Sequence, residues 1–207
     1  VLSQACKSSD DEEKEIIDPT PDEEVIEVEL DRYLEETGLY FGDFWKEGYG
    51  NYYFELANGE VGLASEIETV PMNPGDYILS LDMWGDLSED HALPLLPEGV
   101  YTASQGRANH TFNLQHTLAI FNREQVDTQF RIDYIRFTDG TVTVKHVAEG
   151  YDIRAHLVTE AGQVYEFTYV GNVDMTDWSD DEEERWEIGR DVTVNPIAVT
   201  KAKWEDP

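Results

Sequence analysis

Aromatic side chains concentrate in one short stretch of the chain, among glycines at positions 42, 48 and 50. Its members are Tyr40, Phe41, Phe44, Trp45, Tyr49, Tyr52 and Tyr53. In sugar-binding β-modules, exposed Trp and Tyr rings pack against the apolar faces of pyranose rings, and Asp or Asn side chains bond the hydroxyls. Because residues 46–48 are polar and include a glycine, we expect Trp45 and Tyr49 to lie on a loop and to contact a ligand together with Asp43 and Asn51. The alternative is that these aromatic residues belong to the core, as large aromatic side chains commonly do.

A second candidate site is a run of carboxylates around Trp178, near the C-terminal end. Ca2+ binds about six to eight oxygen ligands, which an acidic loop can supply. The sequence lacks the regular Asp and Asn spacing of an EF-hand loop, so it predicts weak Ca2+ binding at most. The expected ligands are Asp174, Asp177, Asp180 and Asp181. The alternative is a solvated charge run that holds no ion.

Other signatures of catalysis are absent from the sequence. None of the five histidines has the i, i+4 partner of a helical zinc site. His110 and His116 would lie about 20 Å apart on a single strand. The sequence contains no Gly-x-Ser-x-Gly nucleophile elbow and no glycine-rich phosphate loop followed by Lys and Ser or Thr. We therefore expect a protein that is neither an enzyme nor a cofactor carrier. A hydrolase with an unrecognised carboxylate pair is an alternative, because 45 acidic residues allow many pairings.

The only cysteine, Cys6, cannot form a disulfide within the chain. It follows Leu2 and Ala5, and an acidic run at residues 10–13 comes soon after it. A small residue directly before a cysteine, with Leu upstream, resembles the end of a bacterial lipoprotein signal peptide. The acidic run resembles the export signal of Bacteroidetes lipoproteins displayed on the outer cell surface. The resemblance implies that residues 1–5 are a signal-peptide remnant, that Cys6 is lipidated, and that the protein is anchored to the outer membrane.

The composition excludes several classes of partner. The chain has 45 Asp and Glu residues against 14 Lys and Arg residues, which gives a net charge of −31. No basic cluster is present to bind nucleic acid or anionic lipid. No apolar run approaches the roughly 18 residues of a transmembrane helix. With 40% hydrophobic and 12% aromatic residues, the chain is nevertheless too apolar to be disordered throughout.

The acidic residues are concentrated in two segments. Twelve lie in residues 10–31, where Lys14 is the only base, and nine lie in residues 174–191. Like charges repel one another and offer little apolar surface for burial, so such segments stay solvated. We therefore expect an acidic disordered tether at 6–24, one β domain at 25–173, an acidic loop at 174–191, and an edge strand or tail at 192–207.

Period-two alternation predicts strands through most of the chain after position 50. Residues 77–83 alternate throughout, whereas residues 130–137 slip in phase at 134–135, which indicates a bulge. Turn residues predict three hairpins, at 58–59, at 139–140 and at 160–162. The best helix is predicted over residues 27–36, in competition with a strand.

Short strands, close turns and little helix predict an all-β fold. We expect an antiparallel β-sandwich, with a closed lipocalin-like β-barrel as the alternative. The order of motifs over residues 40–172 resembles β-rich lipoproteins of Bacteroidetes. These motifs are Tyr-Phe-Gly-Asp at 40–43, Leu-Pro-Glu-Gly-Val-Tyr at 96–101 and Gly-Thr-Val-Thr-Val at 140–144. That family has no settled activity, so the resemblance concerns fold and location.

The expected function follows from the anchor and from the absence of a catalytic motif. We expect a surface-exposed outer-membrane lipoprotein that acts as a non-catalytic binding or accessory subunit of an uptake complex for glycans or peptides. The alternative is a structural or assembly partner of an outer-membrane β-barrel protein.

Overall fold

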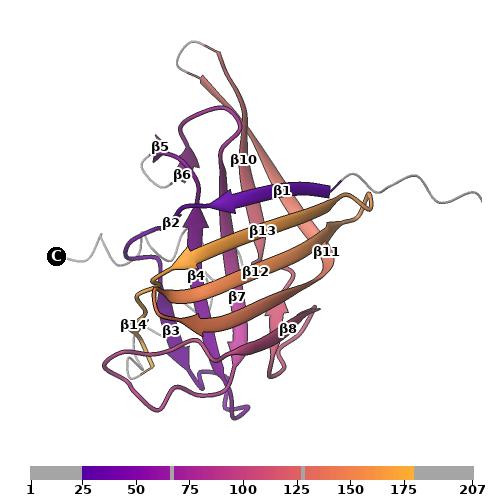
Figure 1. Cartoon of the computed structure of the whole chain (residues 1–207). Coiled ribbons are helices and arrows are strands. Elements are labelled where there is room, and N and C mark those ends of the chain that lie inside the picture. Colours follow the sequence, from indigo (N-terminus) through magenta and orange to yellow (C-terminus); the bar gives the residue numbers. More distant parts are fainter. Residues whose placement is uncertain (1–24, 66–67, 127–128, 180–207) are drawn as a thin grey trace, which may run out of the picture.

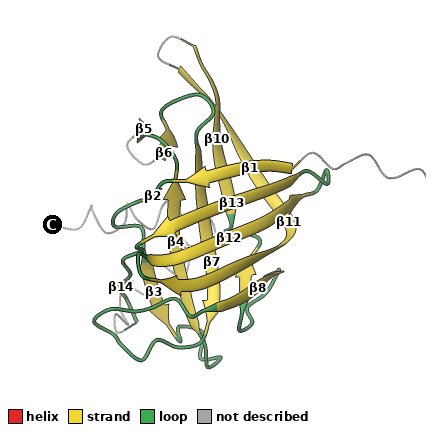
Figure 2. Ribbon diagram, viewed as in Figure 1, coloured by secondary structure: helices red, strands yellow, loops and turns green. Residues whose placement is uncertain are grey.

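A computed structural model describes residues 25–65, 68–126 and 129–179. Every element of regular structure in this part is a strand, which confirms the predicted all-β class (Figures 1 and 2). These residues include no helix long and apolar enough to cross a membrane. Cys6, the predicted tether at 6–24 and the predicted tail at 192–207 lie outside the described residues.

The strands follow one another closely along the chain. In order they are β1 (Val25–Leu30), β2 (Arg32–Tyr33), β3 (Leu39–Gly42), β4 (Gly50–Ala57), β5 (Val61–Ser65), β6 (Glu68–Pro71), β7 (Tyr77–Gly85), β8 (Gly99–Ser104), β9 (Thr111–Asn113), β10 (Leu118–Val126), β11 (Gln129–Val147), β12 (Gly150–Thr159), β13 (Val164–Gly171) and β14 (Thr176–Asp177). The last of them, β14, falls within the segment that was expected to form an acidic loop.

Hydrogen bonds join five strands into a closed, barrel-like ring in the order β11, β10, β7, β9 and β8. Further strands extend this ring on two sides. Strands β12, β13 and β1 continue from β11, and β4, β3 and β14 continue from β7. The result is two crossing layers of strands joined through the ring, which combines features of the expected sandwich and of the barrel alternative (Figure 1). Most pairs are antiparallel, but β1–β13, β14–β3 and β8–β9 are parallel.

Strand β11 passes from one layer to the other without a turn. Its first part pairs with β10 and its second part with β12 and β8. The hairpin predicted at residues 139–140 is therefore wrong. Asp139 and Gly140 instead lie beside a register shift between Phe137 and Asp139, a few residues after the predicted slip at 134–135. Such bulges let a strand bend at the corner between crossing layers.

Two other local predictions are also wrong. The helix predicted over residues 27–36 is absent, and the competing strand is confirmed: this segment contains most of β1 and all of β2. Val28 and Leu30 are buried while Glu27 and Glu29 are exposed, which is a period of two. The hairpin predicted at 58–59 is also wrong, because β5 pairs with β6 and not with β4. Both edges of β4 are already occupied, by β7 on one side and by β2 and β3 on the other. The hairpin predicted at 160–162 is confirmed by the pairing of β12 with β13.

The core lies between the two layers. Its largest fully buried side chains include Tyr52, Phe54, Leu81, Met83 and Phe167. Strands β4 and β7 are buried along their whole length on both faces. Their second face, which points away from this core, carries polar as well as apolar side chains. Polar side chains are therefore buried on the outer face of these strands, a face that is ordinarily exposed to water in a two-layer fold.

Candidate functional site

The predicted aromatic loop joins β3 to β4. The Asp43 carboxylate accepts hydrogen bonds from the backbone N–H groups of Glu47, at 2.7 Å, and Gly48, at 3.1 Å. Lys46 and Gly48 both have positive φ, as a tight turn of this kind requires. Asp43 therefore shapes the loop, and both of its carboxylate oxygens are engaged there.

Trp45 and Tyr49 both lie on this loop, as predicted, and both are half-buried. The Arg107 guanidinium lies 4.0 Å from the centroid of the Trp45 ring, and the Phe44 ring packs edge-on at 4.5 Å. Tyr49 donates its hydroxyl hydrogen to Glu47 and packs edge-on against Trp84 at 5.9 Å. Partial burial, together with the Glu47 hydrogen bond and charge, raises the pKa of Tyr49 to about 12.

Asn51, the fourth predicted ligand contact, is buried at the start of β4. Its Nδ2 donates to Asp82 Oδ1 at 2.5 Å and to the Met83 carbonyl at 3.1 Å. The other carboxylate oxygen of Asp82 lies 2.9 Å from Nδ1 of His116. Asn51 is thus part of a buried polar cluster on the second face of β4 and β7. Its amide nitrogen is therefore engaged inside the protein.

A second acid, Glu55, lies further along the same face of β4. It accepts hydrogen bonds from the Tyr53 hydroxyl at 2.6 Å and the Ser80 hydroxyl at 3.1 Å. Burial raises the pKa of Glu55, because the charged form loses its water, although these two hydrogen bonds act in the opposite direction. Glu55 and Asp82 are diagonal neighbours across β4 and β7, and each is hydrogen-bonded inside the protein.

The predicted Ca2+ ligands are only partly described, because Asp180 and Asp181 lie outside the described residues. Asp174 accepts a hydrogen bond from Asn172 at 2.6 Å, and Asp177 lies 2.7 Å from Nδ1 of His91. Across the ranges that the structure describes, no three His, Cys, Asp or Glu side chains are grouped so that they could hold a metal ion.

His91, Asp177 and Ser179 form a trio that resembles a catalytic triad in composition only. The Ser179 hydroxyl lies 3.3 Å from His91 Nδ1, the same nitrogen that Asp177 contacts. In a nucleophilic triad the acid and the nucleophile meet opposite ring nitrogens. Burial acts to raise the pKa of Asp177, but hydrogen bonds from Ser179 and His91 outweigh it and leave the pKa below its ordinary value. The trio therefore fastens β14 to the loop that follows β7.

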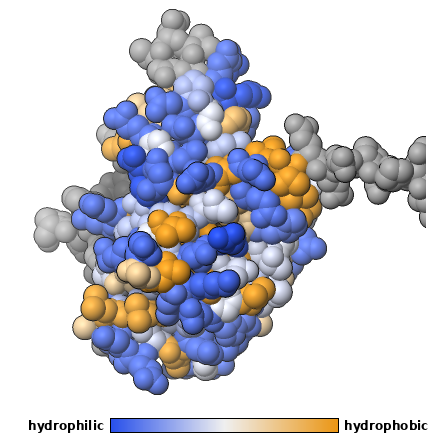
Figure 3. Space-filling model, in the orientation of Figure 1, coloured by the Kyte–Doolittle hydropathy of each residue, from blue (hydrophilic) through white to orange (hydrophobic). Residues whose placement is uncertain are grey.

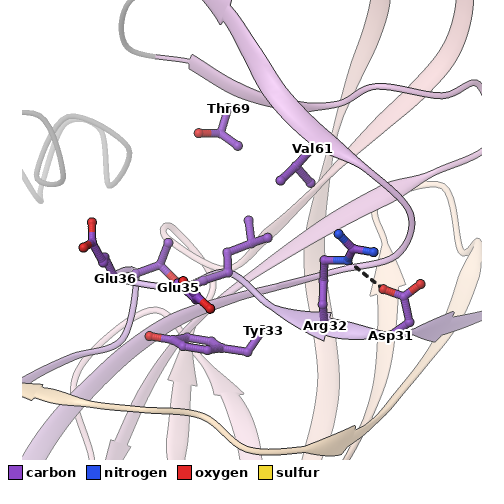
Figure 4. A pocket seen from close by; sticks show the side chains of 9 residues that line it. Asp31, Arg32, Tyr33, Glu35, Glu36, Val61 and Thr69 are labelled. Carbon is purple, nitrogen blue, oxygen red and sulfur yellow. Dashed lines mark hydrogen bonds and ion pairs between the residues drawn. The ribbon is translucent and has the colours of Figure 1, made fainter.

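An open pocket of about 750 Å³ lies at the opposite end of β4 from the aromatic loop. Figure 4 shows Tyr33 on one side of this pocket and Val61 and Thr69, from β5 and β6, on the other. The remaining lining residues are Asp31, Arg32, Leu34, Glu35, Glu36 and Thr37. The Tyr33 hydroxyl donates to the Asp174 carbonyl at 2.7 Å and accepts from the Gly38 N–H at 2.8 Å, so the ring is held in place.

The charge of this pocket is negative. Arg32 lies 2.9 Å from Asp31, and its hydrogen bond holds the pKa of Asp31 below its usual range. Glu35 and Glu36 are exposed and form no ion pair with any residue that the structure describes. Glu36 has a φ of 67°, which is unusual for a residue other than glycine and often occurs at functional sites.

The sequence did not predict this pocket, because it left residues 27–36 open between a helix and a strand and did not indicate which element lies across from them. On a helix, Tyr33, Glu35 and Glu36 would point in different directions. The local pattern also does not indicate that these residues lie across from a hairpin about thirty residues later in the chain. The local signal was the Thr37–Gly38 pair directly after two acids, which is more typical of a turn than of a helix interior.

No family model matches the chain, and neither a curated protein nor a solved structure matches it.

Proposed function

We propose that this chain is a non-catalytic binding subunit, displayed as a lipid-anchored protein on the outer membrane, that captures ligand for an uptake complex. The observation that carries the binding role is the open pocket between Tyr33 and the β5–β6 hairpin. It joins the Tyr33 ring, the Thr69 hydroxyl and the exposed carboxylates of Glu35 and Glu36, the kind of mixture by which binding clefts fix polar ligands. The anchor follows from the resemblance of the Cys6 region to lipoprotein signals.

Of the two ligand classes, the pocket favours a peptide with a basic side chain over a neutral glycan. Glu35 and Glu36 offer two carboxylates, while the one guanidinium of the pocket is already paired with Asp31. A Lys or Arg side chain placed there gains an ion pair, and its charge is attracted by the face of the Tyr33 ring. The net charge of −31 also steers cationic ligands toward the protein.

Isothermal titration with short peptides tests this proposal. We expect a Lys-containing tripeptide to bind, and the same peptide with an acetylated lysine to bind about two- to fivefold more weakly, since an ion pair with an exposed carboxylate contributes up to about 1 kcal/mol. The double change Glu35→Gln and Glu36→Gln should produce a similar loss. The matched control is Glu27→Gln with Glu29→Gln, which removes the same charge from exposed positions on β1.

Two results would contradict a peptide site in this pocket. One is equal affinity for the free and acetylated peptides. The other is an equal loss of affinity in the pocket variant and in the β1 control, which would mean that only the overall charge attracts the peptide. Retention of neutral oligosaccharides with loss on Tyr33→Ala would identify the ligand as a glycan.

A second candidate function, docking on an outer-membrane barrel, is favoured by the loop between β7 and β8. Leu87, Leu93 and Leu95 are exposed by 44%, 66% and 53%. Figure 3 shows apolar side chains gathered at the lower left of the molecule, over this loop. The loop is fixed by hydrogen bonds from Ser88 N–H to the Tyr40 hydroxyl and from Leu96 N–H to the Tyr151 hydroxyl. A barrel partner should be lost on Leu93→Ser with Leu95→Ser and retained by the pocket variants.

A further inference from the structure

The first half of β11 and the end of β10 form a two-stranded arm that extends beyond the other strands (Figure 1). Strand β10 pairs with β7 only as far as Phe121, and β11 pairs with β12 only from Phe137 onward. Over residues 130–133, β11 therefore has β10 on one edge and no strand of the described chain on the other. A strand edge of this kind can pair with a further strand through its backbone N–H and C=O groups.

The side chains of this part of β11 alternate between two faces of the arm. Phe130, Ile132 and Tyr134 lie on one face, and Arg131 and Asp133 lie on the other. Phe130 and Ile132 are only partly buried, and Tyr134 is 49% exposed. One face of this edge is therefore apolar and reaches the surface, and the opposite face is charged.

The charged face carries two ion pairs with β10. Arg131 lies 3.3 Å from Glu124, and Asp133 lies 3.6 Å from Arg123. All four side chains are between 41% and 58% exposed, so they remain accessible to a second protein. Charges on a strand edge commonly prevent association, because like charges repel when two copies meet. Here the two edge charges have opposite signs, so this protection does not operate against an antiparallel second copy.

The sequence of this edge is complementary to itself. When two copies of β11 lie antiparallel with Ile132 opposite Ile132, each Arg131 lies opposite an Asp133 and each Phe130 lies opposite a Tyr134. Opposite charges and aromatic pairs that face each other directly are contacts that stabilise antiparallel strands. Every described side chain from 130 to 134 thus meets a suitable side chain of the second copy.

The ion pairs with β10 fit the same arrangement. They extend each new pair into a row across four strands, from Glu124 through Arg131 to the second copy's Asp133 and Arg123. The signs in this row alternate, so each charge lies between charges of opposite sign. The two rows are related by the two-fold axis at Ile132.

We propose that the first half of β11 is the interface through which two copies of this chain form a two-fold symmetric dimer, paired antiparallel about Ile132. The contact is isologous and therefore closes after two copies. The arm is also where repulsion between two chains of charge −31 is least. It contains three of the eight Lys and Arg residues that the structure describes, namely Arg123, Arg131 and Arg136. The dimer depends neither on the Tyr33 pocket nor on the lipid anchor.

Analytical ultracentrifugation of the whole chain tests this proposal. A salt concentration of about 150 mM screens the repulsion between the two acidic chains beyond about 8 Å. A reductant prevents a disulfide between the Cys6 residues of two copies. We expect the fraction of dimer to increase with concentration up to about 0.5 mM, because an interface of one strand pair is small and therefore weak.

Two charge reversals examine the register of the pairing. Arg131→Asp and Asp133→Arg each place like charges opposite one another in both ion pairs across the interface. Each should weaken the dimer at least about tenfold, because two attractive contacts become repulsive. Both side chains are largely exposed, so both variants should fold. An equimolar mixture of the two variants again has opposite charges in both pairs, and we expect it to form a heterodimer with about wild-type affinity.

The matched control for the first variant is Lys145→Asp. It makes the same change in net charge at an exposed position on the second half of β11, outside the arm. It should keep the wild-type affinity between copies.

Three results would overturn the proposal. The first is a monomer over the whole range of concentration. The second is an effect of Arg131→Asp that is absent or no larger than that of Lys145→Asp, which would place the contact elsewhere. The third is a mixture of Arg131→Asp and Asp133→Arg that forms no heterodimer although the wild type dimerises. Peptide binding at the Tyr33 pocket is measured separately, so the two proposals can fail independently.

Discussion

The carboxyl group of Glu55 lies on the second face of β4, where it forms no ion pair within the described part of the chain. Its partners are the hydroxyls of Tyr53 and Ser80. Burial raises its pKa in the folded protein, while in the unfolded chain the group titrates near its ordinary value. Its contribution to stability is therefore complete below the unfolded pKa and is lost as pH rises through the folded pKa.

Replacing this carboxyl with a neutral amide should remove that dependence. We expect Glu55→Gln to gain stability relative to the wild type as the pH rises from about 4 toward neutrality, because only the wild type must then either bury a charge or keep a proton. Thermal melting at a series of pH values measures this. Glu29→Gln, on an exposed position, is the control and should follow the wild-type curve. Parallel curves for wild type and Glu55→Gln would show that the buried carboxyl does not titrate differently on folding.

At the scale of single residues, most of the polar side chains in the candidate sites form hydrogen bonds within the protein. Asp43 holds the aromatic loop, Asn51 and His116 hold Asp82, and Tyr33 holds the chain near Asp174. Polar atoms that are engaged in this way are not available to a ligand. Asp43 and Asn51 are therefore structural residues of the aromatic loop and of the buried polar cluster.

At the scale of elements, β11 joins the two layers at a corner that contains Gly140. The φ of Gly140 is 146°, and a Cβ atom there would lie 2.3 Å from the His156 carbonyl oxygen on β12. The bulge between Phe137 and Asp139 and this glycine together bend the strand so that it can pair with β10 before the corner and with β12 after it.

Adding a single methyl group at this corner should therefore destabilise the folded protein. We expect Gly140→Ala to lower the free energy of unfolding by about 1–3 kcal/mol from backbone strain alone, and by more if β12 must shift. Gly106→Ala is the control, because a Cβ there meets nothing within 4 Å, and it should be nearly neutral. Urea denaturation of the two variants provides the comparison. Equal midpoints for both would mean that the corner tolerates a side chain and that β11 bends by other means.

At the scale of the whole molecule, the proposed lipid anchor would attach the protein to the membrane through Cys6. In a native host that carries the signal peptide, we expect the protein to fractionate with the membrane and to incorporate a palmitate analogue. Cys6→Ala should release the protein or block its maturation, because stable anchoring requires the acyl chains. Fractionation and analogue labelling measure both effects. An alanine variant that labels and fractionates like the wild type would contradict the proposed lipid anchor, without bearing on the proposed binding pocket.

The sequence by itself determined the class of fold and several local features, because these depend on neighbouring residues. Alternation with a period of two identifies strands such as β7, and the Ala161–Gly162 turn links two runs that are adjacent along the chain. Polar residues and a glycine similarly predicted that Trp45 and Tyr49 lie on a loop. In each case the decisive information lies within about ten residues.

Only the tertiary structure decided which strands pair and which residues, distant in the sequence, lie side by side as a result. The Asp-Gly pair at 139–140 is compatible with a hairpin or with a bulge, and the choice depends on β10, β8 and β12, which offer edges to both halves of β11. The cluster of Asn51, Asp82 and His116 joins residues more than thirty positions apart. The pocket likewise needs the β5–β6 hairpin to lie across from Tyr33. Pairing between distant strands depends on which strand edges are free once the other strands have paired. The local pattern of one strand does not indicate which edges these are.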